Sequence, residues 1–539
     1  MKQYKLLFLF ITAFATLIPV ILSAQVDTAW VRKYNGTGSH NDWAEDMVVD
    51  RQGNVYVTGR SQAPNDYDDW ATVKYNTAGV QQWVSRYSGS ANLNDEGNCI
   101  VIDGQGNVFV AGYISNADSS IDCVTIKYNS NGETLWTRRY NGPGNGDDYP
   151  SAIAVDQQGN IYITDESKGS GTDVDWATIK YNSNGIQQWV TRLNGSANLY
   201  DAPWGIVLDN SGNIYVTGEV RNSSLYSDIL TVKYNSSGNS VWMQTYNGPG
   251  NGNDYGNAIA LDNTGNVYIT GGSDSPSFYI DYVTIKYNES GTQQWVSRYN
   301  GPGNGDDFAV AIAVDNQGNS YITGLSTGTS NYYDYATIKY NTNGDTAWIR
   351  RYNGPGDRDD RAWSIAIDNH GDVYITGDSY YSDSILEDYA TIKYSSAGVM
   401  RWVTRFDGEE ESHDYCFRIA LDSLNNIYVS GGTDDTSGYD YGTIKYVQVP
   451  GVEENRSPLS ADGLSFEVYP NPAKTYFTIH FLHVTDRTQI KIFDVTGNII
   501  KQAMCKKQEM KISLDGIKNG VYFVQVGDKS KTNKLIITK

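Results

Sequence analysis

The chain has 539 residues and a net charge of −21, from 62 Asp and Glu against 41 Lys and Arg. The charge is uneven, because residues 464–539 carry 12 Lys and Arg against 6 Asp and Glu, which makes them +6 and the remainder −27. Such an acidic surface excludes nucleic acid as a partner of the main part of the chain, whereas cations and basic partners remain compatible with it.

The N-terminal segment has the pattern of a secretory signal peptide. Lys2 and Lys5 precede an apolar run over residues 6–22, which ends in Ser23-Ala24. This order of a basic, an apolar and a small-residue region predicts a signal peptide over residues 1–24, with cleavage near Ala24. No Cys follows within the next few positions, which argues against an N-terminal lipid anchor. We therefore expect an exported protein.

A repeat of 53 residues governs most of the chain. Tryptophans recur at this interval from Trp30 to Trp348, with Trp402 following 54 later, and a Lys in a Thr-Ile/Val-Lys-Tyr strand recurs from Lys74 to Lys445. There are eight of each, but the first Trp precedes any Lys strand and the last Lys has no Trp strand after it. A ring explains this offset, because the first Trp strand can complete the last sheet and remove free edges. The pattern predicts an all-β fold with an eight-bladed β-propeller over residues 25–446, closed by an N-terminal strand around Trp30.

One repeat, residues 254–299, shows the expected blade. Apolar alternation predicts strands over 259–261, 267–270, 283–287 and 295–299, bounded by Gly, Asn, Asp and Ser. In such an antiparallel meander the connections from the fourth strand to the next first strand, and from the second strand to the third, lie on one face of the disc. We call it the top face.

Aspartates recur at three positions of every repeat. The first opens the first strand, the second ends it, as Asp262 does, and the third opens the third strand. They have either a structural role, in which each satisfies turn donors or pairs with a recurring Lys or Arg, or a ligand-binding role on the top face. The opening residues of the first strands are Asp42, Asp95, Asp148, Asp201, Asp254, Asp307, Asp360 and Asp414, and those of the third strands are Asp69, Asp122, Asp175, Asp228, Asp281, Asp334, Asp388 and Asp440.

Two sets of top-face residues are candidate ligand-binding sites. Four loops read Asn-Gly-Pro-Gly and then an acidic segment ending in Asp148, Asp254, Asp307 or Asp360, and Asp281 and Asp334 lie on the same face. Carboxylate and carbonyl oxygens suit Ca²⁺, although no dedicated calcium loop is present and the same letters form ordinary turns. The loops between second and third strands vary and carry Tyr, among them Tyr380 and Tyr381, which suits recognition of a glycan or protein.

The sequence holds no recognised catalytic motif. Its five His are dispersed, and it lacks G-x-S-x-G, H-E-x-x-H and P-loop patterns. We therefore expect no catalytic residue and no required cofactor, and favour a non-enzymatic binding or scaffold module. The alternative is a secreted polysaccharide hydrolase or lyase that uses top-face carboxylates.

The repeat D-x-x-G-N-[VI]-Y-[VI]-T-G, D-Y-x-T-I-K-Y-N and Q-Q-W-V-x-R-Y, found from Asp27 to Tyr446, resembles the SBBP-type β-propeller repeat of secreted bacterial proteins. Asp165 departs from it where the second strand usually has Gly, and Asn425 replaces a turn Gly. The resemblance implies a propeller and a surface or secreted location, with no defined reaction or ligand.

The last part of the chain differs from the repeats. Residues 447–463 are rich in Pro, Glu, Ser and Gly and read as a linker, and residues 464–539 alternate as a small β-sandwich would. Four motifs in this tail resemble, in order, the type A sorting domain of the type IX secretion system of Bacteroidota. They contain Tyr469, Pro470, Asn471, Pro472, Gly497, Gly520, Tyr522 and Lys539. The resemblance implies contact with the type IX machinery, removal of the tail, and release or attachment to surface lipopolysaccharide.

Overall fold

The computed structural model describes residues 25–38, 41–380, 386–408, 412–435, 438–449, 466–469, 473–481, 488–494, 498–505, 509–526 and 532–537. All regular structure in these ranges is β-strand, which confirms the all-β prediction. The chain divides into two compact units, residues 1–451 and 452–539. The predicted signal peptide lies outside the described residues. Within the described ranges, no helix is long and apolar enough for a membrane span.

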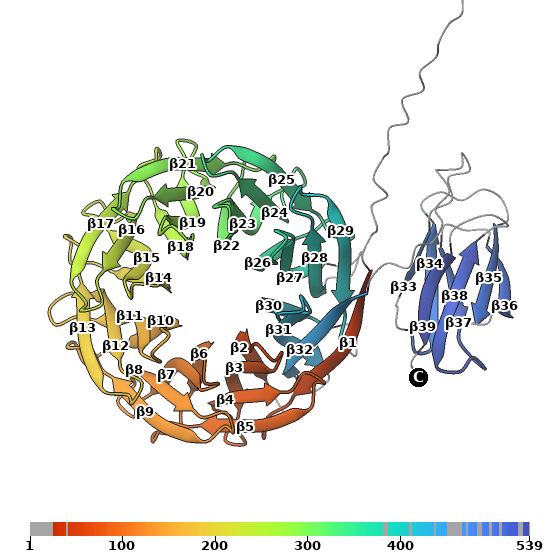
Figure 1. The fold of residues 1–539 in the computed structure, drawn as a ribbon, viewed down its shortest axis with the longest axis horizontal. Coiled ribbons are helices and arrows are strands. Elements are labelled where there is room, and N and C mark those ends of the chain that lie inside the picture. The colour runs from red at the N-terminus through yellow and green to blue at the C-terminus, as the bar shows by residue number, and fades with distance from the viewer. Residues whose placement is uncertain are drawn as a thin grey trace, which may run out of the picture. The chain divides into compact units, whose positions relative to one another are not determined.

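The first unit contains eight four-stranded antiparallel sheets, which Figure 1 shows side by side around a ring. We number the sheets in chain order. Sheets 1 to 4 are β2 (Asp42–Val49), β3 (Val55–Gln62), β4 (Asp68–Tyr75) and β5 (Gln81–Tyr87); β6 (Asp95–Ile102), β7 (Val108–Ser115), β8 (Ile121–Tyr128) and β9 (Thr134–Tyr140); β10 (Asp148–Val155), β11 (Ile161–Lys168), β12 (Val174–Tyr181) and β13 (Gln187–Leu193); β14 (Asp201–Leu208), β15 (Ile214–Arg221), β16 (Ser227–Tyr234) and β17 (Ser240–Tyr246).

Sheets 5 to 8 are β18 (Asp254–Leu261), β19 (Val267–Asp274), β20 (Ile280–Tyr287) and β21 (Gln293–Tyr299); β22 (Asp307–Val314), β23 (Ser320–Thr327), β24 (Tyr333–Tyr340) and β25 (Thr346–Tyr352); β26 (Asp360–Ile367), β27 (Val373–Tyr380), β28 (Glu387–Tyr394) and β29 (Met400–Phe406); β30 (Asp414–Leu421), β31 (Ile427–Asp435), β32 (Gly438–Val449) and β1 (Gln25–Tyr34). The first strand of each sheet lies innermost in the ring (Figure 1).

The eighth sheet joins the two ends of the repeat array. β1 pairs antiparallel with β32, and Trp30 lies opposite Lys445. Lys445 Nζ and the Tyr428 and Tyr441 hydroxyls donate to backbone carbonyls of sheet 1 at 3.2–3.3 Å. β32 continues to Val449, beyond the predicted linker boundary at residue 447, because residues 447–449 pair with residues 25–27 of β1. The rest of the predicted linker lies outside the described residues.

The recurring Trp and Lys both bind the neighbouring sheet, which accounts for their common period. Trp242 on the fourth strand of sheet 4 donates from Nε1 to the carbonyl of Glu289, in the turn before β21, at 3.1 Å. Gly291 of that turn has φ +83°, and a Cβ there would lie 2.8 Å from the indole. Lys286 on the third strand of sheet 5 donates from Nζ to the Thr342 carbonyl, in the turn before β25 of sheet 6, at 3.3 Å. We call the first arrangement the Trp–turn contact. It recurs at Trp30, Trp83, Trp136, Trp189, Trp295 and Trp348.

The hydrophobic cores of the first unit lie between successive sheets. In one of them Tyr215 and Ile229 of sheet 4 pack with Ile259, Val267 and other residues of sheet 5. Three cysteines, Cys99, Cys123 and Cys416, are buried and free. Burying apolar side chains on both faces of each sheet makes every sheet dependent on its neighbours.

The described part of the second unit has two sheets around one core. One sheet has the order β33 (Phe466–Tyr469), β34 (Tyr476–Phe481), β37 (Glu509–Ser513), and the other has the order β36 (Ile499–Cys505), β35 (Thr488–Asp494), β38 (Gly520–Val526), β39 (Thr532–Ile537). Phe477 and Ile479 of the first sheet share a core with Ile490, Val524 and Leu535 of the second. The two sheets therefore pack as the predicted sandwich does.

Among the predicted sorting residues, Tyr469 ends β33 and Gly520 begins β38. Tyr522 is buried in the core and donates its hydroxyl to the Lys518 carbonyl at 2.9 Å. The others, Pro470, Asn471, Pro472, Gly497 and Lys539, lie outside the described residues.

Candidate functional site

The predicted aspartates that open the first strands are buried and close their own loops. All eight are 0% exposed, and each accepts a hydrogen bond from the Gly N–H six residues earlier. For Asp148, Asp254, Asp307 and Asp360 these distances are 2.8, 2.7, 2.6 and 2.6 Å. Burial raises the pKa of Asp254 and Asp360 to about 6 and raises that of Asp148 and Asp307. These carboxylates face the protein interior.

Six of the eight predicted aspartates that open the third strands pair with an arginine of the fourth strand. Asp281 lies 3.1 Å from Arg298 and Asp334 lies 2.7 Å from Arg351, and both aspartates are 7% exposed. Arg351 also donates to the Tyr299 hydroxyl of the preceding sheet at 2.9 Å. The pair therefore joins strands within a sheet and sheets to one another.

The structure distributes the predicted ligand-binding residues that it describes over sheets 3, 5, 6 and 7, and it does not gather them around one cavity. Tyr380 ends β27, and its hydroxyl is hydrogen-bonded to Glu387. Tyr381 lies outside the described residues. A binding site shared by several sheets must therefore be formed by other residues.

The innermost strands also differ between sheets, at one position of each strand. In each of them the pairing register shifts around the fourth residue, as between Ala309 and Ala311 in β22. A β-bulge of this kind interrupts an edge and turns a side chain toward a new direction. The eight residues at the shift are Glu45, Asn98, Ser151, Trp204, Asn257, Val310, Trp363 and Phe417. The repeats therefore differ in sequence at this position of the innermost strands.

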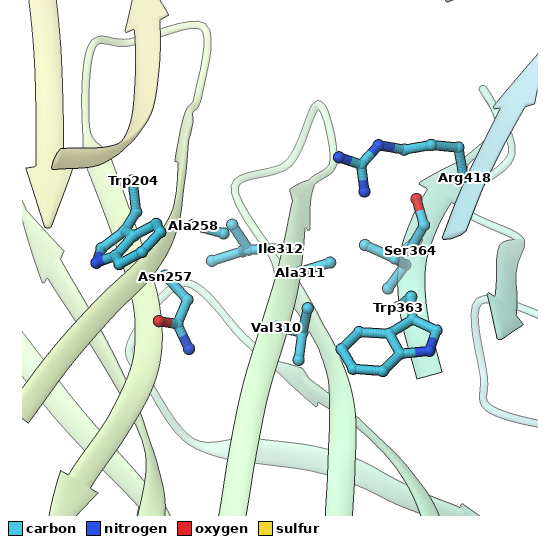
Figure 2. Close-up of a pocket in the computed structure, with 10 residues that line it drawn as sticks. Trp204, Asn257, Ala258, Val310, Ala311, Ile312, Trp363, Ser364 and Arg418 are labelled. Atoms are coloured by element: carbon cyan, nitrogen blue, oxygen red, sulfur yellow. The ribbon is translucent and has the colours of Figure 1, made fainter. Parts of the chain in front are cut away.

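A cavity of about 440 Å³ opens along five of these strands, β14, β18, β22, β26 and β30. We call it the channel cavity. Figure 2 shows Trp204 and Trp363 at its two ends, with Asn257 and Val310 between them and Arg418 above. Its lining is Trp204, Asn257, Ala258, Val310, Ala311, Ile312, Trp363, Ser364, Ile365 and Arg418.

The polar groups of the channel cavity are held in place by the neighbouring inner strands. Asn257 donates from Nδ2 to the Ala309 carbonyl at 2.9 Å, and the Ser364 hydroxyl accepts from the Ile419 N–H at 3.3 Å. Arg418 donates from Nε to Asp46 of sheet 1 at 2.8 Å. Trp204 remains 39% exposed. The cavity therefore offers two indole faces with oriented hydrogen-bonding groups between them.

A polar network of sheets 7 and 8 extends from one end of this cavity. Trp363 donates from Nε1 to Asp378, which also lies 3.5 Å from Arg361. Arg361 bonds Glu387 at 3.2 Å, and the other oxygen of Glu387 lies 2.6 Å from His413 Nδ1. Burial raises the pKa of Asp378 to about 7. An imidazole oriented by a buried carboxylate can accept or donate a proton through its second nitrogen.

Sequence reasoning missed this region, although one signal was present. Of the 13 Trp, eight belong to the periodic series. Trp70 and Trp176 are fully buried on third strands. The remaining three, Trp43, Trp204 and Trp363, all lie on innermost strands. Looking for tryptophans outside the period would have pointed to the channel.

Two family models match the chain. Residues 467–538 match the secretion system C-terminal sorting domain, and residues 30–68, 135–170 and 294–333 match the SBBP β-propeller repeat. Both are the families identified from the sequence motifs.

Among curated proteins, an uncharacterized WD repeat-containing protein of Acanthamoeba polyphaga mimivirus is 24% identical over 55% of this chain and 30% of its own length. Beta-agarase A of Zobellia galactanivorans is 30% identical over 19% of this chain and 20% of its own length. The chain therefore spans less than a third of the length of these curated relatives.

Among solved structures, PorZ, a surface component of the type IX secretion system of Porphyromonas gingivalis, is 13% identical and has a TM-score of 0.22, covering 92% of this chain and 86% of its own. An ulvan lyase, described as a new polysaccharide lyase family, is 14% identical and has a TM-score of 0.39, covering 78% of this chain and 96% of its own. At TM-scores below 0.5 these likenesses carry no argument.

Proposed function

We infer that the protein is a secreted binding module exported by the type IX secretion system. The chain carries SBBP-type β-propeller repeats and a C-terminal sorting domain of that system. The ligand enters the channel cavity, and the binding is not accompanied by catalysis. One observation carries this proposal: the innermost strands have side chains that differ between sheets, and part of these side chains line one cavity with two tryptophans.

The propeller of this proposal has eight blades and is closed by β1. Three observations support it. The first unit has eight four-stranded sheets, β1 supplies the fourth strand of the last one, and sheet 8 donates three hydrogen bonds to sheet 1. Closure leaves the inner strands as edges around a channel, where the bulges protect them.

A neutral oligosaccharide is the ligand that best fits the channel cavity. The faces of Trp204 and Trp363 suit the apolar faces of sugar rings, and Asn257, Ser364 and Arg418 offer hydrogen-bonding groups to hydroxyls. The charge of −27 on residues 1–463 disfavours a polyanionic chain. We therefore propose the channel cavity, instead of the tyrosine-bearing loops, as the binding site for the predicted glycan partner.

The test is binding of neutral oligosaccharides to the mature protein on a glycan array, followed by calorimetry of the strongest hit. Each aromatic contact contributes roughly 0.5–1.5 kcal/mol, so Trp204→Ala with Trp363→Ala should weaken binding roughly 5- to 150-fold. Phe278→Ala is the matched control, because Phe278 is 88% exposed in a loop between β19 and β20. Binding that survives the double substitution, or is lost with the control, contradicts the channel site.

A polysaccharide-active enzyme is the second candidate function, and the His413–Glu387 pair favours it. The top-face carboxylates proposed from sequence for this role are bonded inside the protein, whereas His413 lies beside the polar network of the channel. The same oligosaccharides, assayed for reducing ends and unsaturated products, distinguish the two functions. Turnover that His413→Ala removes while binding persists would identify an enzyme, and binding without any product supports the binding module.

A further inference from the structure

A carboxylate of the second strand lies beside each of the two channel tryptophans. In sheet 4, Glu219 pairs with Ala202, two positions before Trp204 at the register shift. In sheet 7, Asp378 takes the same place relative to Trp363. We call this second-strand position the bulge partner. The other six sheets have no Trp at the register shift, and their bulge partners are Arg60, Tyr113, Glu166, Gly272, Leu325 and Gly432.

Both carboxylates accept a hydrogen bond from the indole beside them. Trp363 donates from Nε1 to Asp378, and Trp204 is hydrogen-bonded to Glu219. Figure 2 shows the nitrogen of each indole on the side of the ring that points away from the middle of the cavity. The N–H is the one polar group of an indole, and it is a donor only. The two rings therefore satisfy their donors inside the protein and present carbon surface to the channel.

The two carboxylates are buried, whereas the indoles that they hold are not. Glu219 is 6% exposed and Asp378 is 1% exposed, but Trp204 is 39% exposed. Burying a carboxylate costs free energy that hydrogen bonds and opposite charges must offset. Glu219 also accepts from the Ser227 hydroxyl, and Asp378 lies 3.5 Å from Arg361. Each carboxylate is thus held by its own sheet behind a ring that reaches the channel.

We propose that Glu219 and Asp378 are positioning residues of the channel cavity, which fix the two indole rings so that their faces meet the ligand. This inference rests on the function proposed above, the binding of an oligosaccharide in that cavity. The fold does not require a carboxylate at the bulge partner, because sheet 6 has Leu325 there. A ring that is already fixed loses little rotamer freedom on binding, which favours affinity by roughly 2- to 10-fold for each side chain.

The surroundings of Asp378 make its hydrogen bond to Trp363 dependent on pH. Burial raises the pKa of Asp378 to about 7, although the Trp363 N–H and Arg361 oppose the shift. Above this pH the ionised carboxylate accepts strongly, and below it the neutral carboxyl group accepts more weakly. Ligand affinity should therefore fall as the pH falls through about 7. The titratable and charged groups of the neighbouring strands near Asp378 are Arg361 on β26, Glu387 and Tyr389 on β28, Tyr335 on β24, Tyr415 and Cys416 on β30, and His413, which bonds Glu387.

The first test needs no ligand. It follows the indole N–H signals of the mature protein, labelled with ¹⁵N-tryptophan, by NMR, and Trp204→Phe and Trp363→Phe assign the two signals. We expect the Trp363 signal to move with pH around a midpoint near 7, and Asp378→Asn to abolish this movement. Asp378→Leu should shift the Trp363 signal and Glu219→Leu the Trp204 signal. An indole signal that does not respond to its own carboxylate would overturn the proposal, and the wild-type titration decides this even if a Leu variant does not fold.

The second test is calorimetry with the neutral oligosaccharide that binds most strongly on the array, at about pH 6 and about pH 8. Glu219→Leu and Asp378→Leu should each weaken binding roughly 2- to 10-fold at the higher pH. Asp378→Asn keeps an acceptor oxygen that does not titrate, so its affinity should be the same at both pH values.

Glu166→Leu is the matched control for the two Leu variants. Glu166 is the third carboxylate at the bulge partner, but the residue at the register shift of its sheet is Ser151, and Glu166 accepts from the Tyr200 hydroxyl at 2.6 Å. This variant should leave both the affinity and the two indole signals unchanged. Weaker binding in Glu166→Leu would overturn the proposal, because it would show that any substitution at this position disturbs the cavity.

The remaining outcomes separate this inference from the proposed function. If Trp363→Ala weakens binding and Asp378→Leu does not, the positioning role fails and the channel site stands. A pH response that persists in Asp378→Asn would also overturn the role of Asp378, by assigning the response to another group such as His413. If no neutral oligosaccharide binds the wild type, the proposed function fails, and the positioning role fails with it whatever the indole signals show.

Discussion

Asp254 and Asp262 of sheet 5 lie at opposite ends of β18 and have opposite electrostatic environments. Burial dominates at Asp254 and raises its pKa to about 6, although the Gly248 N–H opposes the shift. At Asp262 burial is outweighed by hydrogen bonds from Asn266 and Thr264, and the pKa is lowered. The first carboxylate favours its neutral form and the second its charged form.

These two residues should therefore change stability with pH in opposite directions. The contribution of Asp254 is present below about pH 4 and is lost as the pH rises to about 6, because the folded state holds the proton more tightly. The contribution of Asp262 is present above about pH 4 and is lost as the pH falls. Relative to wild type, Asp254→Asn should become less harmful as the pH rises from about 4 to 7, and Asp262→Asn should become less harmful as the pH falls below about 4. Thermal unfolding midpoints at four pH values measure this, and slopes of the same sign would contradict it.

At the scale of the element, the Trp–turn contact explains why this repeat has a fixed length. The indole must meet a turn of the next sheet, so every residue added between two such contacts would move a donor from its acceptor. Trp402 is the exception, because the fourth strand of the neighbouring sheet 8 is β1, from the other end of the repeat array. The Trp402 Nε1 is buried and has no hydrogen-bond partner among the described residues.

Gly291→Ala should destabilise the protein more than Gly265→Ala. Both glycines have positive φ, +83° and +80°, which costs a residue with a Cβ about 1 kcal/mol. At Gly291 the new Cβ would also lie 2.8 Å from the Trp242 ring, whereas at Gly265 it would meet a flexible Glu289 side chain at 3.3 Å. We expect an additional cost of about 1–3 kcal/mol at Gly291. Urea unfolding of both variants gives the difference, and equal costs would show that the Trp–turn contact can relax.

The strands themselves were predicted with their order but not their full length. The first strand of sheet 5 was expected at residues 259–261, yet β18 begins at Asp254. Its first three residues pair with Ser273, Gly272 and Gly271 before the register shift, and a bulge removes the alternation that sequence analysis relies on. Glycine and serine at strand ends carry no apolar signal.

The candidate site was missed for a related reason. A comparison of the repeats selects residues that recur in every repeat, such as the aspartates. These aspartates are buried and are bonded to other groups of the protein. The channel cavity is built from residues that do not recur, such as Trp204 and Arg418. These residues line one cavity only because the ring brings five innermost strands close together, and the sequence of a single repeat does not indicate this arrangement.

At the scale of the whole molecule, the chain combines a unit with β-propeller repeats and a unit with the sorting-domain match, and the two have opposite net charges. The sorting motifs that are described, at Tyr469, Gly520 and Tyr522, belong to the second unit alone. We therefore expect export to depend on that unit, and ligand binding to depend on the first.

Deleting residues 464–539 should leave the first unit folded in the periplasm and abolish its appearance on the cell surface or in the medium. Fractionation of cells that express the full and truncated chains measures this, with oligosaccharide binding of the periplasmic fraction as the control for folding. Normal surface display of the truncated chain would contradict the role of the tail, and lipopolysaccharide attached to the exported full chain would identify how it is retained.

The pairing of β1 with β32 has a kinetic consequence. Their partners Trp30 and Lys445 are more than 400 positions apart, so the seam forms only after the intervening sheets have stacked. The strand that comes first in the described chain is the last to dock, and assembly is expected to be slow. In the proposed closed propeller, the ring opens only when β1 separates from β32, and we expect the lifetime of the protein outside the cell to depend on how rarely β1 detaches.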